Sequence, residues 1–118
     1  MNLIKPTIIL LALLVTAFAN AELRWDAALT GAHRSEGNAD RNSARHPRET
    51  LEFFGLTSGM TVMEVAPGGG WYTEILAPYL RDKGTLFAAA YPGDIPGESG
   101  AYYRKSRAAF EAKLAGAA

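Results

Sequence analysis

Hydrophobic and polar positions divide the chain into a short apolar start and a mixed remainder. Lys5 is followed by an apolar run over residues 7–18 and then by Ala19-Asn20-Ala21. A basic start, a short apolar run and small residues two apart are typical of a secretory signal peptide. The run is shorter than the roughly 20 apolar residues of a membrane-spanning helix. We therefore predict a cleaved signal peptide over residues 1–21; the alternatives are a permanent anchor and a buried N-terminal helix.

The predicted export determines the compartment of the mature chain. The mature chain, residues 22–118, is expected in the periplasm or outside the cell, and the membrane is a partner only transiently, through the signal peptide. A chain of this length fits one small domain.

The first part of the mature chain shows helical spacing separated by a polar stretch. Apolar residues recur at helical intervals over residues 23–29, and Gly31 follows. Residues 33–46 are almost all charged, small or polar, which predicts a long loop. A proline at the start and Gly55 just after the end predict a helix over residues 47–54.

The second part alternates between strand and helix patterns. Residues 60–65 are β-branched or apolar apart from Glu64 and predict a buried strand, and residues 85–90 predict a second one. Between them, apolar residues at helical spacing predict a helix over residues 71–80, and a last helix is predicted over 102–114. A strand, helix, strand unit of this kind is expected to be parallel and right-handed.

A glycine-rich turn, Pro67–Gly70, joins the first strand to its helix. This geometry presents backbone N–H groups and a helix N-terminus to an anionic ligand group, and glycine allows close approach and positive φ. A mononucleotide loop would continue with Lys and Ser or Thr, where Trp71 and Tyr72 stand. The dinucleotide pattern G-x-G-x-x-G fails at Thr73. What remains is Glu64 at the strand end, a short spacer and glycines.

This acidic-x-x-x-Gly-x-Gly arrangement resembles the first motif of class I S-adenosylmethionine-dependent methyltransferases. More closely, the chain is similar to a family of exported predicted methyltransferases with a Pro-Gly-Gly-Gly-Trp-Tyr-Thr turn. The closer resemblance extends over nearly all of the mature chain, although only its last stretch is specific by itself. The stretches that carry it are Gly31-Ala-His-Arg34, Arg45-His-Pro47, Glu49-Thr50, Phe53-Phe-Gly-Leu56, Gly59-Met-Thr-Val62 and the block from Pro67 to Leu80.

The resemblance implies an α/β fold: the N-terminal part of a Rossmann-like class I methyltransferase domain, with parallel strands and flanking helices over residues 22–118. It implies S-adenosylmethionine as the cofactor, with Gly68, Gly69 and Gly70 against its methionine carboxylate and ribose and Glu64 facing its amino group. The complete fold has about seven strands, so the chain is expected to be an incomplete fragment that does not transfer methyl groups alone. The methyl acceptor is unknown. Methyl transfer depends mainly on positioning, so no catalytic residue is assigned.

Composition excludes several other functions. Without the signal segment the chain has slightly more acidic than basic residues, so no nucleic-acid partner is expected. It has no cysteine, which excludes disulfides and thiolate chemistry, and its two histidines, His33 and His46, lack the spacing of a metal site. A non-catalytic exported α/β module for binding or interaction is the alternative function.

Three features keep two interpretations each. The glycine run is either a ligand-binding turn or a tight strand-to-helix turn without a ligand. Glu64 is either a cofactor ligand or a helix-capping or salt-bridged carboxylate. The arginines of the polar loop, Arg34, Arg41 and Arg45, form either a solvated loop or a flap over the cofactor or an anionic substrate. The acidic residue that methyltransferases usually have at the end of the second strand falls near Ala90 here, and Asp94 is the nearest carboxylate in sequence.

Signal cleavage is directly testable. Ala19 and Ala21 fit the small-residue pockets of signal peptidase, so we expect Glu22 to be the N-terminal residue of exported protein. Intact mass spectrometry of exported material should show a chain short by the first 21 residues. Recovery of the full-length chain fixed in the inner membrane would contradict the prediction.

Overall fold

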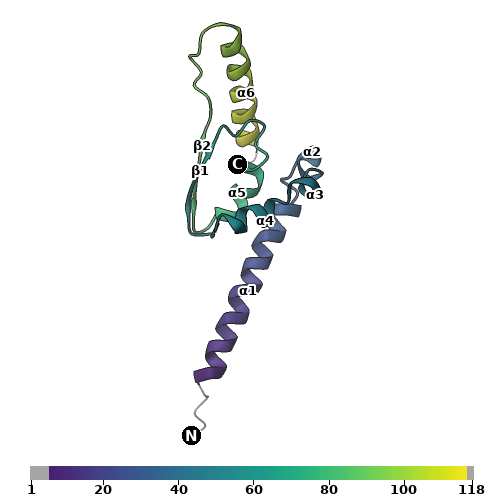
Figure 1. Cartoon of the computed structure of the whole chain (residues 1–118), viewed down its shortest axis with the longest axis vertical. Helices are drawn as coiled ribbons and strands as arrows, with labels where there is room; N and C mark the ends of the chain where they lie inside the picture. Colours follow the sequence, from purple (N-terminus) through teal and green to yellow (C-terminus); the bar gives the residue numbers. More distant parts are fainter. Residues whose placement is uncertain (1–5, 117–118) are drawn as a thin grey trace.

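The computed structural model describes residues 6–116, drawn in Figure 1. Its elements are, in chain order, α1 (Pro6–Thr30), α2 (Glu36–Ala39), α3 (Asn42–Arg45), α4 (Pro47–Phe53), β1 (Thr61–Val65), α5 (Thr73–Leu80), β2 (Thr85–Ala89) and α6 (Gly97–Gly116). Within this part of the chain, β1 and β2 form one parallel two-stranded sheet with helices around it. The α/β prediction with parallel strands and flanking helices is therefore confirmed.

The two strands have one covered face and one open face. In the parallel register Val62 lies beside Leu86, and both pack against the core with α5. Met63 lies beside Phe87 on the opposite face, and these side chains remain 64% and 54% exposed. Since parallel strands need a crossover connection, α5 is both the link between the strands and the cover of one face.

The core lies where α5 meets α1. Ile75 and Leu80 of α5 are fully buried. The ring centroid of Tyr79 lies 4.2 Å from that of Trp25 of α1. Burial of a large apolar side chain stabilises the fold by roughly 1.5–3 kcal/mol. The contact between α1 and α5 therefore anchors the N-terminal helix to the strand, helix, strand unit.

Helix α1 is longer than the helix that the spacing predicts over residues 23–29. It continues without interruption from Pro6 to Thr30, so it includes most of the segment predicted to be a signal peptide. In Figure 1 its N-terminal half extends as a rod away from the other elements. Among the residues that the structure describes, no helix combines the length and the apolar character needed to cross a membrane.

The polar stretch over residues 33–46 is not a plain loop, because it contains the one-turn helices α2 and α3. Neither helix buries a residue of its own, so no hydrophobic period marks them in the sequence. Their stabilisation comes from polar side chains instead. Arg34 donates hydrogen bonds to the carbonyl of Asn38 in α2 and to the side-chain oxygen of Asn42 in α3.

Gly84, just before β2, is a position where a larger residue would disturb the sheet. A Cβ atom there would lie 2.6 Å from the Met60 carbonyl oxygen and 2.8 Å from that of Ser58. We expect Gly84→Ala to lower the free energy of unfolding by about 1–3 kcal/mol, as overpacking does elsewhere. Urea unfolding measures the change. Gly59→Ala is the control, since a Cβ at Gly59 meets nothing within 4 Å; an equal loss in both variants would contradict the steric argument.

Candidate functional site

The turn between β1 and α5 has a regular backbone alternation. Ala66, Gly68 and Gly70 have positive φ angles of 54°, 56° and 78°, and these three residues alternate with Pro67 and Gly69. The expected positive φ is thus found at Gly68 and Gly70. Ala66 is a further such position, at which a residue with a Cβ is strained. Alternation between left- and right-handed residues is a backbone arrangement in which successive N–H groups can line one concavity that suits an anion.

The N–H groups of this turn are only partly used. The Gly70 N–H donates to the Pro67 carbonyl oxygen at 2.8 Å and closes the turn. Among the described residues, none accepts a hydrogen bond from the N–H of Gly68 or Gly69. A Cβ atom at Gly69 would meet no heavy atom within 4 Å. Two backbone donors of this turn therefore have no acceptor among the described residues.

Glu64 lies at the carboxyl end of β1, beneath the start of α5. Its Oε2 accepts a hydrogen bond from the Thr73 hydroxyl at 2.5 Å. Burial raises the pKa of the Glu64 carboxyl, and the interaction with Thr73 lowers it only in part. The Thr73 side chain, at the first position of α5, thus holds one oxygen of this carboxyl. Oε1 has no hydrogen-bond partner among the described residues, so one acceptor is left over.

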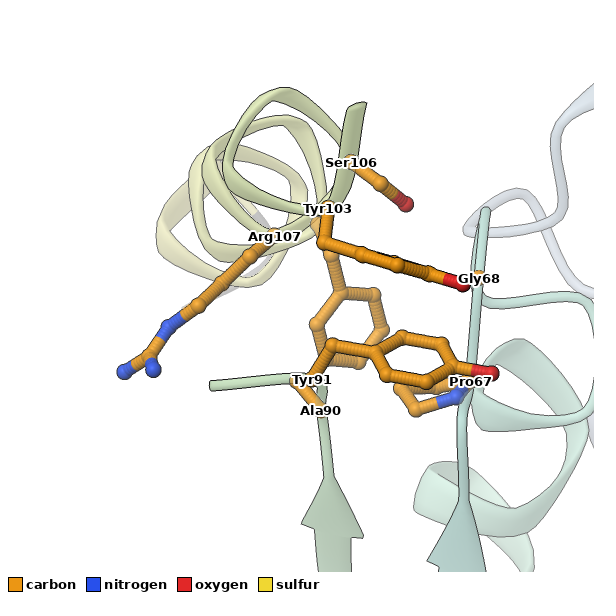
Figure 2. A pocket seen from close by; sticks show the side chains of 8 residues that line it. Pro67, Gly68, Ala90, Tyr91, Tyr103, Ser106 and Arg107 are labelled. Carbon is orange, nitrogen blue, oxygen red and sulfur yellow. The ribbon is translucent and has the colours of Figure 1, made fainter. Parts of the chain in front are cut away.

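A small cavity of about 10 Å³ lies at the carboxyl ends of both strands. Figure 2 shows Pro67 and Ala90 side by side beyond the strand ends, with α6 crossing above them. The rings of Tyr91 and Tyr103 lie between the strands and this helix, and their centroids are 4.1 Å apart. The end of β2 thus presents Tyr91 to the cavity, and Asp94 is exposed and does not line it.

Glu74 is a buried carboxylate that the sequence pattern does not reveal. Its side chain is 7% exposed and lies 3.3 Å from Arg34, whose side chain is 2% exposed. It also accepts hydrogen bonds from the Ser35 hydroxyl and the Asn38 amide at 2.9 Å each and from the Lys113 ammonium at 2.5 Å. Burial raises the pKa of Glu74, but these hydrogen bonds outweigh burial and hold the pKa below its usual range.

The arginines of the polar stretch divide into two groups. Arg34 is buried beside Glu74 and donates to the Trp71 carbonyl at 3.0 Å, so the interpretation as a solvated loop is wrong for this residue. Arg41 and Arg45 are exposed, and their guanidinium carbons lie 5.3 and 5.4 Å from the centroid of the Trp71 ring.

The two histidines have different positions. Pro78 lies inside α5 and has no N–H, so it leaves the carbonyl of Glu74 without its helical donor. The Nε2 of His33 lies 2.8 Å from that carbonyl oxygen and therefore carries the proton and donates to it. His46 is exposed, has a φ of 45° and ends α3 where α4 begins. His33 thus serves the fold.

Comparison of the chain with protein-family models, curated proteins and solved structures finds no match. Across residues 6–116, no three His, Asp or Glu side chains are grouped so that they could hold a metal ion.

The Glu74 cluster predicts a pH dependence of stability. Because its folded pKa lies below the ordinary value of 4.5, Glu74 stabilises the fold fully above that value and loses this contribution as the pH falls. We expect Glu74→Gln to lower the free energy of unfolding by about 3–5 kcal/mol at neutral pH, since it leaves Arg34 buried without its counter-ion.

Urea unfolding of the parent and of Glu74→Gln from neutral pH to about pH 4 tests this. The difference between their free energies of unfolding should shrink on acidification. Asp94→Asn is the control, because Asp94 is exposed and has no ion pair among the described residues; a change within about 0.5 kcal/mol is expected. A gap between Glu74→Gln and the parent that is independent of pH would contradict the assignment.

Proposed function

We propose that this chain carries the S-adenosylmethionine-binding part of a class I methyltransferase, exported to the periplasm or beyond, with an unknown methyl acceptor. The observation that carries the proposal is the Pro67–Gly70 turn itself, at the carboxyl end of a parallel strand and the start of a helix. Its alternating backbone and free N–H groups suit a carboxylate, and Glu64 beside it suits an ammonium group. The finer fold assignment, the N-terminal part of a Rossmann-like methyltransferase domain, belongs to the same proposal.

The residues present fit the methionine end of this cofactor. That end is a zwitterion, so it needs hydrogen-bond donors for its carboxylate and an acceptor for its ammonium group. The N–H groups of Gly68 and Gly69 are such donors, and no atom stands within 4 Å of a Cβ built at Gly69. The free Oε1 of Glu64 is such an acceptor, while Oε2 stays with Thr73.

The ionisation of Glu64 supports the same arrangement. Burial raises its pKa, so the ionised form is disfavoured in the folded chain alone. A neighbouring ammonium group would favour that form and offset the burial. The bound group would supply an electrophilic methyl on a sulfonium. The residues of the chain orient this group and keep water from it, and no acid or base is required for that role.

Gly70 has a different role from its two neighbours. A Cβ at Gly70 would lie 3.1 Å from the Phe110 ring of α6, and its φ of 78° is costly for any other residue. Gly70 thus faces a helix, whereas Gly69 faces open space. Of the three glycines, we assign ligand contact chiefly to Gly68 and Gly69.

One observation favours the alternative, a non-catalytic exported interaction module. The open face of the sheet carries Met63 and Val65 on β1 and Phe87 on β2, all more than half exposed. An apolar face of this kind is typical of a surface that another protein segment covers. This alternative predicts partner binding that does not depend on the glycine turn.

Gly69→Val tests the proposal without disturbing the fold. The backbone of Gly69 suits any residue and the space around it is open, but a branched side chain would occupy the place of the ligand. NMR titration with S-adenosylmethionine should shift the amide resonances of Gly68 and Gly69 in the parent. We expect affinity at least about tenfold lower in Gly69→Val, with an unchanged circular dichroism spectrum.

Gly59→Val is the matched control, because it makes the same change in open space at the opposite end of β1 and should bind like the parent. Glu64→Gln keeps an acceptor for Thr73 but removes the charge, so it should weaken binding while leaving the apo fold at least as stable at neutral pH. If Gly69→Val binds as well as the parent, or the parent does not bind, the turn is structural and the methyltransferase proposal fails.

A further inference from the structure

The arginine-rich segment contains four arginines between positions 34 and 48, and they differ in their partners. Arg34 is paired with the buried Glu74. Arg48 is paired with Glu22 and Glu52. Among the described residues, no carboxylate oxygen lies within 4 Å of the guanidinium nitrogens of Arg41 or Arg45. Two cations thus remain without a counter-ion in a segment where the others have one.

These two cations share one aromatic ring. Both guanidinium groups lie over Trp71, at 5.3 and 5.4 Å from its centroid, which is within the range of a cation–π contact. Trp71 is itself fixed, since it is 6% exposed and its indole N–H donates to the Asn38 carbonyl at 2.8 Å. Arg41 and Arg45 are also one helical turn apart, since the Arg45 N–H donates to the Arg41 carbonyl oxygen at 3.0 Å. Residues four positions apart in a helical turn lie on the same side, so the two charged side chains are neighbours.

A guanidinium group over an aromatic ring keeps its hydrogen-bond donors free. The ring interacts with the face of the group, whereas the N–H bonds lie in its plane and point outward. Arg41 and Arg45 are exposed and make no hydrogen bond through these donors within the described part of the chain. The donors are therefore accessible, and their geometry matches the paired oxygens of a carboxylate or a phosphate.

We propose that Arg41 and Arg45, positioned by Trp71, form a binding site for a phosphate monoester. Two neighbouring guanidinium groups carry two positive charges, and a phosphate monoester carries about −1.5 to −2 at neutral pH. A single carboxylate would leave one of the two cations unpaired. The ligand thus carries a terminal phosphate group.

Trp71 directly follows the Pro67–Gly70 turn, so this phosphate site lies next to the turn. The phosphorylated molecule bound there is then the methyl acceptor. That identification rests on the proposed function, whereas the phosphate site itself does not.

NMR titration of the full chain with inorganic phosphate at constant ionic strength tests the site. We expect saturable shifts of the Nε–H resonances of Arg41 and Arg45 and of the Trp71 indole N–H. Acetate, which carries one charge, should bind at least about tenfold more weakly. The double variant R41Q/R45Q should lose at least about tenfold in phosphate affinity, and R41K/R45K should be intermediate because lysine keeps the charge but not the paired donors.

The control variant is R81Q/K105Q, which removes the same charge from two exposed residues without an ion pair among the described residues. It should bind phosphate like the parent. Equal binding by R41Q/R45Q, or an equal loss in the control, would overturn the proposal. Phosphate binding without binding of S-adenosylmethionine would retain this site and reject the methyltransferase function, and the reverse result would reject only the phosphate site.

Discussion

The buried carboxylate of Glu74 holds three parts of the molecule together. It belongs to the first turn of α5 and binds Arg34 and Ser35 from the segment after α1 and Lys113 from α6. Glutamate is seldom buried unless its charge is compensated, and here two cations and three neutral donors provide the compensation. The position of the arginine-rich segment and of the end of α6 therefore depends on one side chain.

The glycine turn depends on this cluster indirectly. Lys113, which binds Glu74, also donates to the Gly69 carbonyl oxygen at 2.8 Å, and Phe110 on the same helix lies against Gly70. The carbonyl side of the turn is thus occupied by α6, while the N–H groups of Gly68 and Gly69 stay free. The same cluster fixes the backbone around Trp71, through the bond from Arg34 to its carbonyl. The two proposed binding sites thus share one structural support.

The sheet and its nearest helices could be predicted well from the sequence because their signals are local. The strand predicted over residues 60–65 is β1, which begins one residue later than predicted. The strand predicted over 85–90 is β2, which ends one residue earlier than predicted. The helix predicted over 47–54 is α4, since proline and glycine mark its limits. The last helix is longer than predicted, because Gly97 and Gly100 near its start argue against a helix there.

The polar contacts could not be predicted, because they join residues far apart in the sequence. Nothing in the pattern of α5 distinguishes Glu74 from an exposed glutamate, since its partners stand about 40 positions away on both sides. For the same reason the sequence does not show that Arg34 is buried while Arg41 and Arg45 are exposed. The positive φ of Gly68 and Gly70 was predictable from residue type, whereas that of Ala66 was not. The cofactor roles of Glu64, Gly68, Gly69 and Gly70 and the signal peptide stay predictions.

The distance in sequence between Glu74 and its partners has a consequence for folding kinetics. β1, α5 and β2 are consecutive, so their contacts close short loops, whereas the Glu74 contacts close loops of 39 residues toward both ends of the chain. Loop closure is entropically unfavourable, and the carboxylate cannot leave water until its cations have arrived. Docking of Arg34 and Lys113 should therefore follow the rate-limiting step. Weakening this cluster would then accelerate unfolding and leave the folding rate nearly unchanged.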